Sequence, residues 1–68
     1  MFDYKKLKAR IIEIFGSQAE FAKAINKDAA YVSRYISGRS EFSQSTVLLW
    51  AESLRIQTED IGLYFFAH

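Results

Sequence analysis

The sequence contains no cysteine and no proline, and glycine occurs only three times in its 68 residues. The absence of cysteine excludes disulfide bonds and thiolate metal sites. The absence of proline and the scarcity of glycine favour helices that are joined by short connections. Together these absences predict an all-α fold.

A long apolar segment is also lacking. No run approaches the roughly 20 residues that a helix needs to cross a bilayer, and the first residues show no signal-peptide pattern. We therefore expect a cytoplasmic protein without a membrane partner. Half of the residues are apolar, and we expect one domain over residues 1–68. A domain of this size buries roughly 60% of its unfolded surface.

Charge of one sign is not in excess, because the formal net charge is only +1. Residues 1–15 hold four cations and two anions, a balance of +2, and residues 52–68 hold one cation and three anions, a balance of −2. Dedicated DNA-binding proteins are usually more basic, since they neutralise phosphates. The charge therefore neither demands nor excludes nucleic acid. The cations of the first helix are expected to form a solvated face: Lys5, Lys6, Lys8 and Arg10.

The first 25 residues predict two helices. The first starts after the N-cap Asp3, runs to about Phe15 and ends at Gly16, which would adopt a positive φ. The second, over about 17–25, begins with a capping box between Ser17 and Glu20, in which each side chain accepts from the backbone N–H of the other residue. Apolar residues at helical spacing would face the core: Tyr4, Leu7, Ile11, Ile14, Phe15, Phe21, Ala22 and Ile25.

A tight turn over residues 26–28 precedes a third helix at about 29–37, which Gly38 ends. Asn26 tolerates the left-handed backbone that the end of a helix often requires, and Asp28 is the expected N-cap. The spacing divides the side chains of this helix into a core set of Val32, Tyr35 and Ile36 and an outward set of Ala29, Ala30, Ser33 and Arg34.

A loop over residues 39–43 leads to a fourth helix at about 44–55. Thr58 would cap a short fifth helix that ends near Phe65, with Phe66 left outside the core. The fourth helix has an apolar stripe at i, i+3, i+4 and i+7, made of Val47, Trp50, Ala51 and Leu54. We therefore expect a compact five-helix bundle around one core.

The second and third helices have the sequence form of a helix-turn-helix, in which one helix is packed and the next is presented to a groove. The residues that define this pattern are Gln18, Ala22, Asn26, Val32, Ser33, Arg34, Tyr35 and Gly38, followed by Ser43, Thr46, Val47, Trp50, Ala51 and Leu54. With them the chain resembles the Cro/repressor helix-turn-helix domains of temperate phages, which implies a lambda-repressor-like fold. The segments MFDYKKLKARI and EDIGLYFF are similar to those of short Cro-like proteins and modulators of repression from Gram-positive hosts.

The resemblance implies roles for the exposed side chains. Arg34 and Ser33 would contact base edges or phosphates in the major groove, since a guanidinium pairs with guanine O6 and N7. Ala29 and Ala30 could supply only apolar contact to thymine methyl groups. Phosphates would be held by Gln18, Arg39, Ser43 and Gln44, helped by backbone N–H groups at the start of the fourth helix.

Other residues depart from the family pattern. Lys27 stands in the turn where an aliphatic residue is usual. Asp28 and Glu41 place negative charge near the expected phosphate path, where either could form an ion pair with Arg34 instead. Ile36 and Leu49 are apolar at positions that are commonly polar, and Leu48 widens the apolar arc of the fourth helix. These residues either fill the small core or form a protein interface.

Two functions fit these residues. The first is a Cro-like transcriptional repressor of a phage genetic switch, which binds double-stranded operator DNA as a homodimer through the fourth helix or the C-terminal aromatic residues. The alternative is an anti-repressor that covers the DNA-binding domain of the cognate phage repressor, through a surface that includes Lys27, Arg34 and Ile36.

Enzymatic activity is not expected. The only histidine is His68, the carboxylates are scattered, and no glycine-rich phosphate loop is present. The sequence therefore predicts no catalytic or metal-binding residue, no cofactor and no small-molecule substrate.

Overall fold

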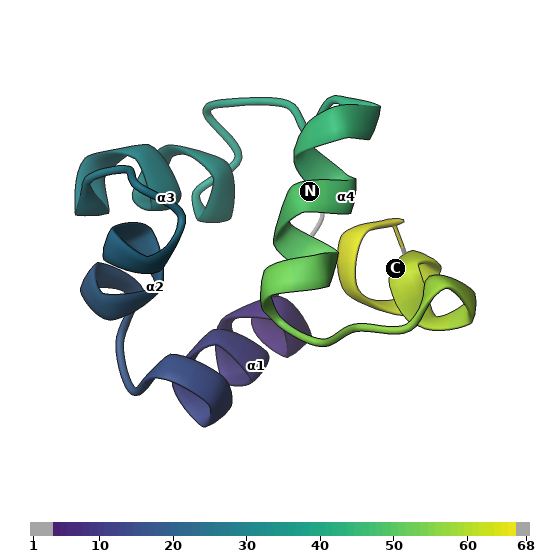
Figure 1. Ribbon diagram of the computed structural model, residues 1–68. Coiled ribbons are helices and arrows are strands. Elements are labelled where there is room, and N and C mark those ends of the chain that lie inside the picture. The colour runs from purple at the N-terminus through teal and green to yellow at the C-terminus, as the bar shows by residue number, and fades with distance from the viewer. Residues whose placement is uncertain (1–3, 67–68) are drawn as a thin grey trace.

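The computed structural model describes residues 4–66, which contain helices and no strand (Figure 1). The α-helices are α1 (Lys5–Phe15), α2 (Gln18–Ala24), α3 (Ala29–Ile36) and α4 (Gln44–Ser53). They are followed by the 3₁₀ turn η1 (Thr58–Asp60) and the π-helical turn η2 (Gly62–Phe66), which together form a fifth helical segment. The predicted all-α bundle of five helices is confirmed. The Cα radius of gyration is 10.8 Å, close to the roughly 11 Å of a compact chain of this length.

α1 turns its apolar face to the core, where Leu7 and Ile11 are fully buried. The helix begins at Lys5, with Tyr4 in the N-cap position, and ends at Gly16. The φ of Gly16 is 91°, which confirms the expected left-handed end and turns the chain toward α2. Two residues named in the sequence analysis lie outside the described residues: Asp3 and His68.

Side-chain caps begin α2 and α3. The Ser17 hydroxyl accepts from the backbone N–H of Glu20 at 3.1 Å, while the Glu20 carboxylate lies 3.5 Å from the Lys23 ammonium, so half of the predicted capping box is confirmed. Asp28 caps α3 as expected, because its Oδ1 accepts at 2.9 Å from the N–H three residues later. Asn26 has the expected positive φ of 64°. Both helices are slightly shorter than predicted.

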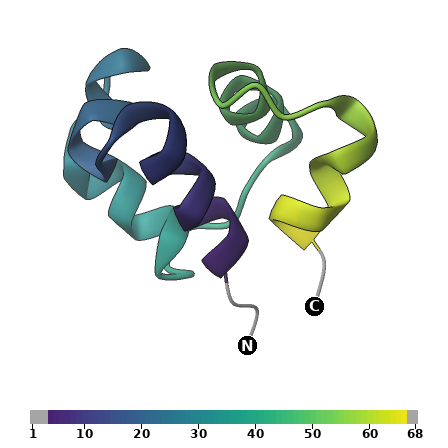
Figure 2. The same ribbon diagram turned by 90° about the horizontal axis from the view of Figure 1, so that it is seen from below.

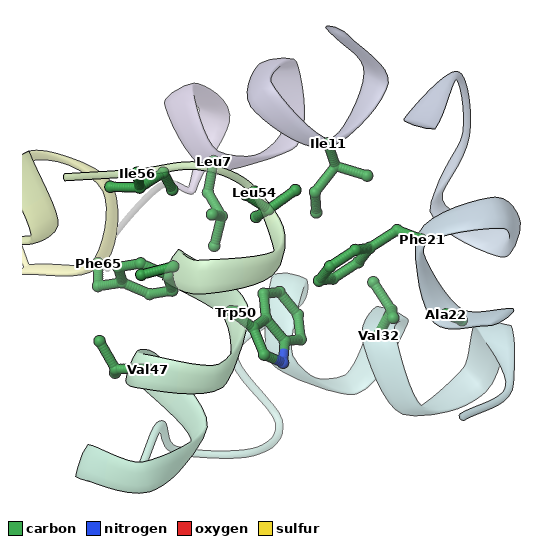
Figure 3. Packing of buried hydrophobic residues seen from close by; sticks show 11 residues of the cluster. Leu7, Ile11, Phe21, Ala22, Val32, Val47, Trp50, Leu54, Ile56 and Phe65 are labelled. Carbon is green, nitrogen blue, oxygen red and sulfur yellow. The ribbon is translucent and has the colours of Figure 1, made fainter. Parts of the chain in front are cut away.

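Trp50 lies at the centre of the core, between α4 and the α2–α3 pair (Figure 3). Its ring centroid is 4.9 Å from that of Phe21 and 5.5 Å from that of Tyr35. Edge-to-face contacts of this kind each contribute about 0.5–1.5 kcal/mol beyond the buried area. The stripe predicted for α4 is buried throughout: Val47, Trp50, Ala51 and Leu54.

Phe42 belongs to the connection between α3 and α4, yet it packs on the core. Its ring centroid lies 4.7 Å from that of Tyr35 and 4.9 Å from that of Trp50. It also lies 5.5 Å from the ring of Tyr4 and 5.0 Å from the ring of Phe65. One side chain of the loop therefore contacts the start of α1, the end of α3, α4 and the C-terminal segment.

The C-terminal segment corrects one prediction. Thr58 does not cap the fifth helix, because Gln57 occupies the N-cap position and Thr58 is the first residue of η1. The backbone N–H of Asp60 donates to the Gln57 carbonyl at 2.8 Å, so a tight 3₁₀ turn closes before η2 begins. Phe65 is buried and Phe66 is 57% exposed, as expected.

Arg10 corrects another prediction, since it is not part of a solvated face. Its Nε donates to the Leu54 carbonyl and its Nη2 to the Arg55 carbonyl, each at 2.9 Å. Its Nη1 is 3.3 Å from the Glu13 carboxylate. The last carbonyls of a helix lack partners within the helix, so the guanidinium caps the end of α4 and ties it to α1. The other cations of this helix are exposed, as predicted: Lys5, Lys6 and Lys8.

α1 begins and η2 ends on the same side of the molecule (Figure 2). There the Lys6 ammonium lies 5.9 Å from the ring centroid of Tyr64.

We expect Arg10→Met to lower the free energy of unfolding by about 2 kcal/mol, because it removes two charge-assisted hydrogen bonds but keeps a long apolar side chain. Urea denaturation would measure the change. Lys8→Met on the exposed side of α1 is the control, since Lys8 is exposed. Equal stability of the two variants would contradict a capping role for Arg10.

Candidate functional site

The outward face of α3 is the first component of the site. Ala29, Ala30, Ser33 and Arg34 are all exposed, whereas Val32 on the opposite side of the helix is fully buried. This is the division that the spacing predicts. The helix therefore presents two methyl groups, one hydroxyl group and one guanidinium group to its surroundings.

The chain after α3 folds back on the end of that helix. The carbonyl of Arg34 accepts from the backbone N–H groups of Arg39, at 2.9 Å, and Ser40, at 3.0 Å. Gly38 permits this reversal with a φ of 86°. The fold thus places Arg39 beside the last turn of α3, so the two arginines are brought to one region of the surface.

The N-terminus of α4 is the second component. The Ser43 hydroxyl accepts from the backbone N–H of Thr46 at 3.2 Å, and it lies 2.9 Å from the Thr46 hydroxyl and 3.2 Å from that of Ser45. These contacts occupy Ser43 as the cap of the helix. Contact with an anion would fall to the exposed Gln44 and to the first backbone N–H groups, which lack partners within a helix.

α3, the connection after it and the start of α4 lie along one side of the molecule (Figure 1). Lys27 is close to this side, since it precedes the N-cap Asp28 of α3 and its ammonium lies 5.2 Å from the ring centroid of Tyr31. Gln18 is half-buried in the first turn of α2, at the end remote from the turn. Ile36 is also half-buried and packs against the core.

The cations of this side form no ion pair with an acidic residue of the described range 4–66. Within residues 4–66 the ion pairs are Arg10–Glu13 and Lys23–Glu20. The ion pair between Arg34 and an acidic neighbour, considered above, is therefore not formed. The unpaired cations of the candidate site are Lys27, Arg34 and Arg39.

Two carboxylates temper the positive charge. Asp28 is exposed, and its Oδ1 accepts a hydrogen bond as the cap of α3. Glu41 lies near Tyr4, whose pKa is raised above the ordinary value of 10.0 by burial and secondly by the Glu41 charge. The side formed by α3 and the following loop therefore holds three cations and two anions.

A separate apolar surface lies on α4 and the C-terminal segment. Leu48 is 53% exposed and Leu49 is 41% exposed, so the wide apolar arc expected on α4 does reach the surface. Leu63 and Phe66 are also exposed, at 52% and 57%. Part of the apolar content of α4 therefore does not fill the core.

Sequence reasoning missed two features of the site. The first is the role of Phe42, whose ring fixes the loop that holds Arg39; an aromatic residue within the polar segment RSEFSQS was the available signal. The second is the placement of Lys27 over Tyr31, for which the four-residue separation was the only hint.

The candidate site offers hydrogen-bond donors rather than side chains that would coordinate a metal ion. Residues 4–66 contain no group of three or more histidine, cysteine, aspartate or glutamate side chains that could hold a metal ion. None of the helices in that range is both long and apolar enough to span a membrane. What the side around α3 can do is bind a surface that is negatively charged or rich in acceptors.

Comparison with curated proteins gave no match to this chain. The sequence pattern of one protein family, described as "Protein of unknown function (DUF739)", matches residues 1–68, which is the full length of the sequence. The chain therefore belongs to this family.

Proposed function

We propose that the protein is a Cro-like, sequence-specific DNA-binding repressor of a phage genetic switch, in which α2 and α3 act as a helix-turn-helix. α3 would enter the major groove of operator DNA, with Arg34 and Ser33 directed to the base edges. The observation that supports the proposal most is the set of unpaired cations around the exposed face of α3: Lys27, Arg34 and Arg39.

The geometry of the neighbouring elements is consistent with phosphate contacts on both sides of the groove. Arg39 lies beside the end of α3, and Gln44 stands in the first turn of α4 with backbone N–H groups that are free to donate. Gln18 has the corresponding place at the start of α2. Such contacts fix the position of a protein on the duplex, and the base-edge contacts supply sequence preference.

The protein would act on DNA as a dimer, because one such module contacts only a few base pairs. The surface available for pairing is the exposed apolar one of α4 and the C-terminal segment. The C-terminal segment lies on the far side of α4 from α3 (Figure 1), so pairing through this segment would leave α3 accessible.

A second function is favoured by the exposed apolar groups. An anti-repressor would bind the DNA-binding domain of the cognate repressor with Lys27, Arg34 and Ile36, and would prevent that repressor from reaching its operator. Protein interfaces combine a depletion of charge at their centre with arginine and apolar residues. The methyl groups of Ala29 and Ala30 would permit close approach of another protein.

We expect Arg34→Ala to weaken binding to the preferred duplex by about 5- to 150-fold, the equivalent of about 1–3 kcal/mol for one bidentate base contact. Binding to an unrelated duplex should change much less. Fluorescence anisotropy, at about 50 and 200 mM salt, on duplexes that the protein enriches from a random-sequence library would measure both.

The control is Arg55→Ala, since Arg55 is an exposed cation at the end of α4 that packs near α1. It should leave the preference between duplexes unchanged. If the unaltered protein bound every duplex equally weakly, the proposal of sequence-specific DNA binding would have to be abandoned.

Sedimentation equilibrium should show a dimer at the concentrations that saturate DNA. Two variants identify the dimer contact: the double substitution Leu48→Lys with Leu49→Lys on α4, and Phe66→Lys in the C-terminal segment. The variant that alters the contact should be a monomer, because it would bury a charge at an apolar interface. Ile12→Lys, at an exposed apolar residue of α1, is the control. A monomer under all conditions, with specific DNA binding intact, would exclude the dimer.

The anti-repressor function predicts that the protein releases the cognate repressor from its operator, and that Ile36→Glu abolishes this release. Because Ile36 packs partly against the core, thermal unfolding must show that the variant is folded. Ala29→Glu, at an exposed position of the same helix, provides a second test. Unchanged release by both variants would exclude this surface as the repressor contact.

A further inference from the structure

The outward face of α3 contains few hydrogen-bonding groups. Successive residues of a helix are rotated by about 100°, so Ala30, Arg34 and Ser37 point away from the buried Val32 and Ser33 lies at the edge of the same face. The Ser37 hydroxyl already donates to the Arg34 carbonyl at 3.3 Å. Only the Ser33 hydroxyl and the Arg34 guanidinium remain as groups with donors for base edges.

The first turn of α3 is apolar at both of its leading positions. Ala29 and Ala30 are exposed, and neither methyl group has a donor or an acceptor. Lys27, the nearest cation before this turn, is held over the Tyr31 ring at 5.2 Å, which directs its charge to the flank of the helix. A polar base edge opposite this turn would therefore lose its water without gaining a partner, which is unfavourable.

One base presents a group that fits such a surface. In the major groove thymine exposes its C5-methyl group, and no other base carries an apolar group there. The small side chain at position 30 also lets the helix backbone approach the floor of the groove. Contact between two methyl groups removes both from water, which is favourable in proportion to the apolar area buried.

We infer that Ala30, assisted by Ala29, selects thymine through its C5-methyl group, and that Arg34 supplies the charged base contact of α3, to guanine. This inference rests on the proposed DNA-binding function and specifies what the recognition helix reads. It assigns sequence preference chiefly to shape and methyl contact, so the operator half-site contains a guanine and at least one thymine whose methyl group is required.

Replacement of thymine by uracil tests the inference, because it removes the methyl group alone and keeps base pairing. On the duplex that the protein enriches from a random library, each thymine is replaced in turn and symmetrically in both half-sites. At one or two positions of a half-site, uracil should weaken binding by about fourfold per half-site, the value for one buried methyl group. Other positions should be unaffected.

Ala30→Gly completes a double-mutant cycle. This variant should bind the thymine duplex about fourfold more weakly per half-site, and it should no longer distinguish thymine from uracil at the sensitive position. Ala19→Gly is the matched control, since Ala19 is the exposed second residue of α2 as Ala30 is of α3. The control has the same glycine substitution in a helix and should keep full sensitivity to uracil.

The outcomes separate this inference from the proposed function. Sequence-dependent binding that ignores every uracil substitution, or uracil sensitivity that persists in Ala30→Gly, would overturn the methyl contact and leave the repressor proposal standing. Failure to enrich any duplex from the library would overturn the proposed function, and the inference with it.

Discussion

The packing of aromatic rings around Trp50 is the constraint on which the rest of the structure depends. The indole is fully buried and meets Phe21 of α2, Tyr31 and Tyr35 of α3, and Phe42 of the following connection, with ring centroids 4.9 to 6.4 Å apart. α2 and α3 are seven and eight residues long, too short to be stable alone in water. Their order and orientation therefore come from this contact. Trp50 belongs to α4, and its ring packs against the buried side of α3. This packing sets the position of α3 relative to the N-terminus of α4, and hence the spacing between the two components of the candidate site.

The connection between α3 and α4 is fixed at both ends, although it has no regular structure. At its start, two backbone N–H groups donate to the Arg34 carbonyl, and at its end the Ser43 hydroxyl caps α4. Between these points the Phe42 ring is inserted among four other rings. A loop held in this way has little conformational entropy left to lose on binding, and such preorganisation raises affinity. Arg39 is thus presented by a rigid segment, as Arg34 is by a helix.

Local rules account for the features that the sequence predicted. The left-handed residues Gly16 and Asn26, the cap Asp28 and the stripe containing Trp50 are each determined by neighbours within about one or two helical turns, and all are confirmed.

The features that sequence reasoning missed depend instead on residues far apart in the chain. Arg10 donates to carbonyls 44 and 45 residues away, and Phe42 contacts rings from four separate segments. Neither pattern has a period that can be read from the sequence. Thr58 failed for a different reason, because a 3₁₀ turn displaced the expected cap by one residue. For the candidate site, exposure was predictable, whereas the ring contacts of Phe42 that hold the loop after α3 required the tertiary structure.

The low net charge of +1 has limited weight against binding to nucleic acid. The molecule measures 26 × 24 × 21 Å, whereas exposed charges are largely screened beyond about 10 Å at 0.1 M salt. Glu59 and Asp60 lie in η1, on the opposite side of the molecule from α3 (Figure 1), so a phosphate beside α3 would scarcely sense them. Glu13 and Glu20 form ion pairs with cations of their own helices.

A phosphate beside α3 would interact chiefly with the three cations Lys27, Arg34 and Arg39, whose charge is offset by Asp28 and Glu41. Because this local balance is small, electrostatic attraction alone would give weak binding, and selectivity would have to come from close contacts of α3. That requirement is consistent with the outward face of α3, where the side chains beside Arg34 are small.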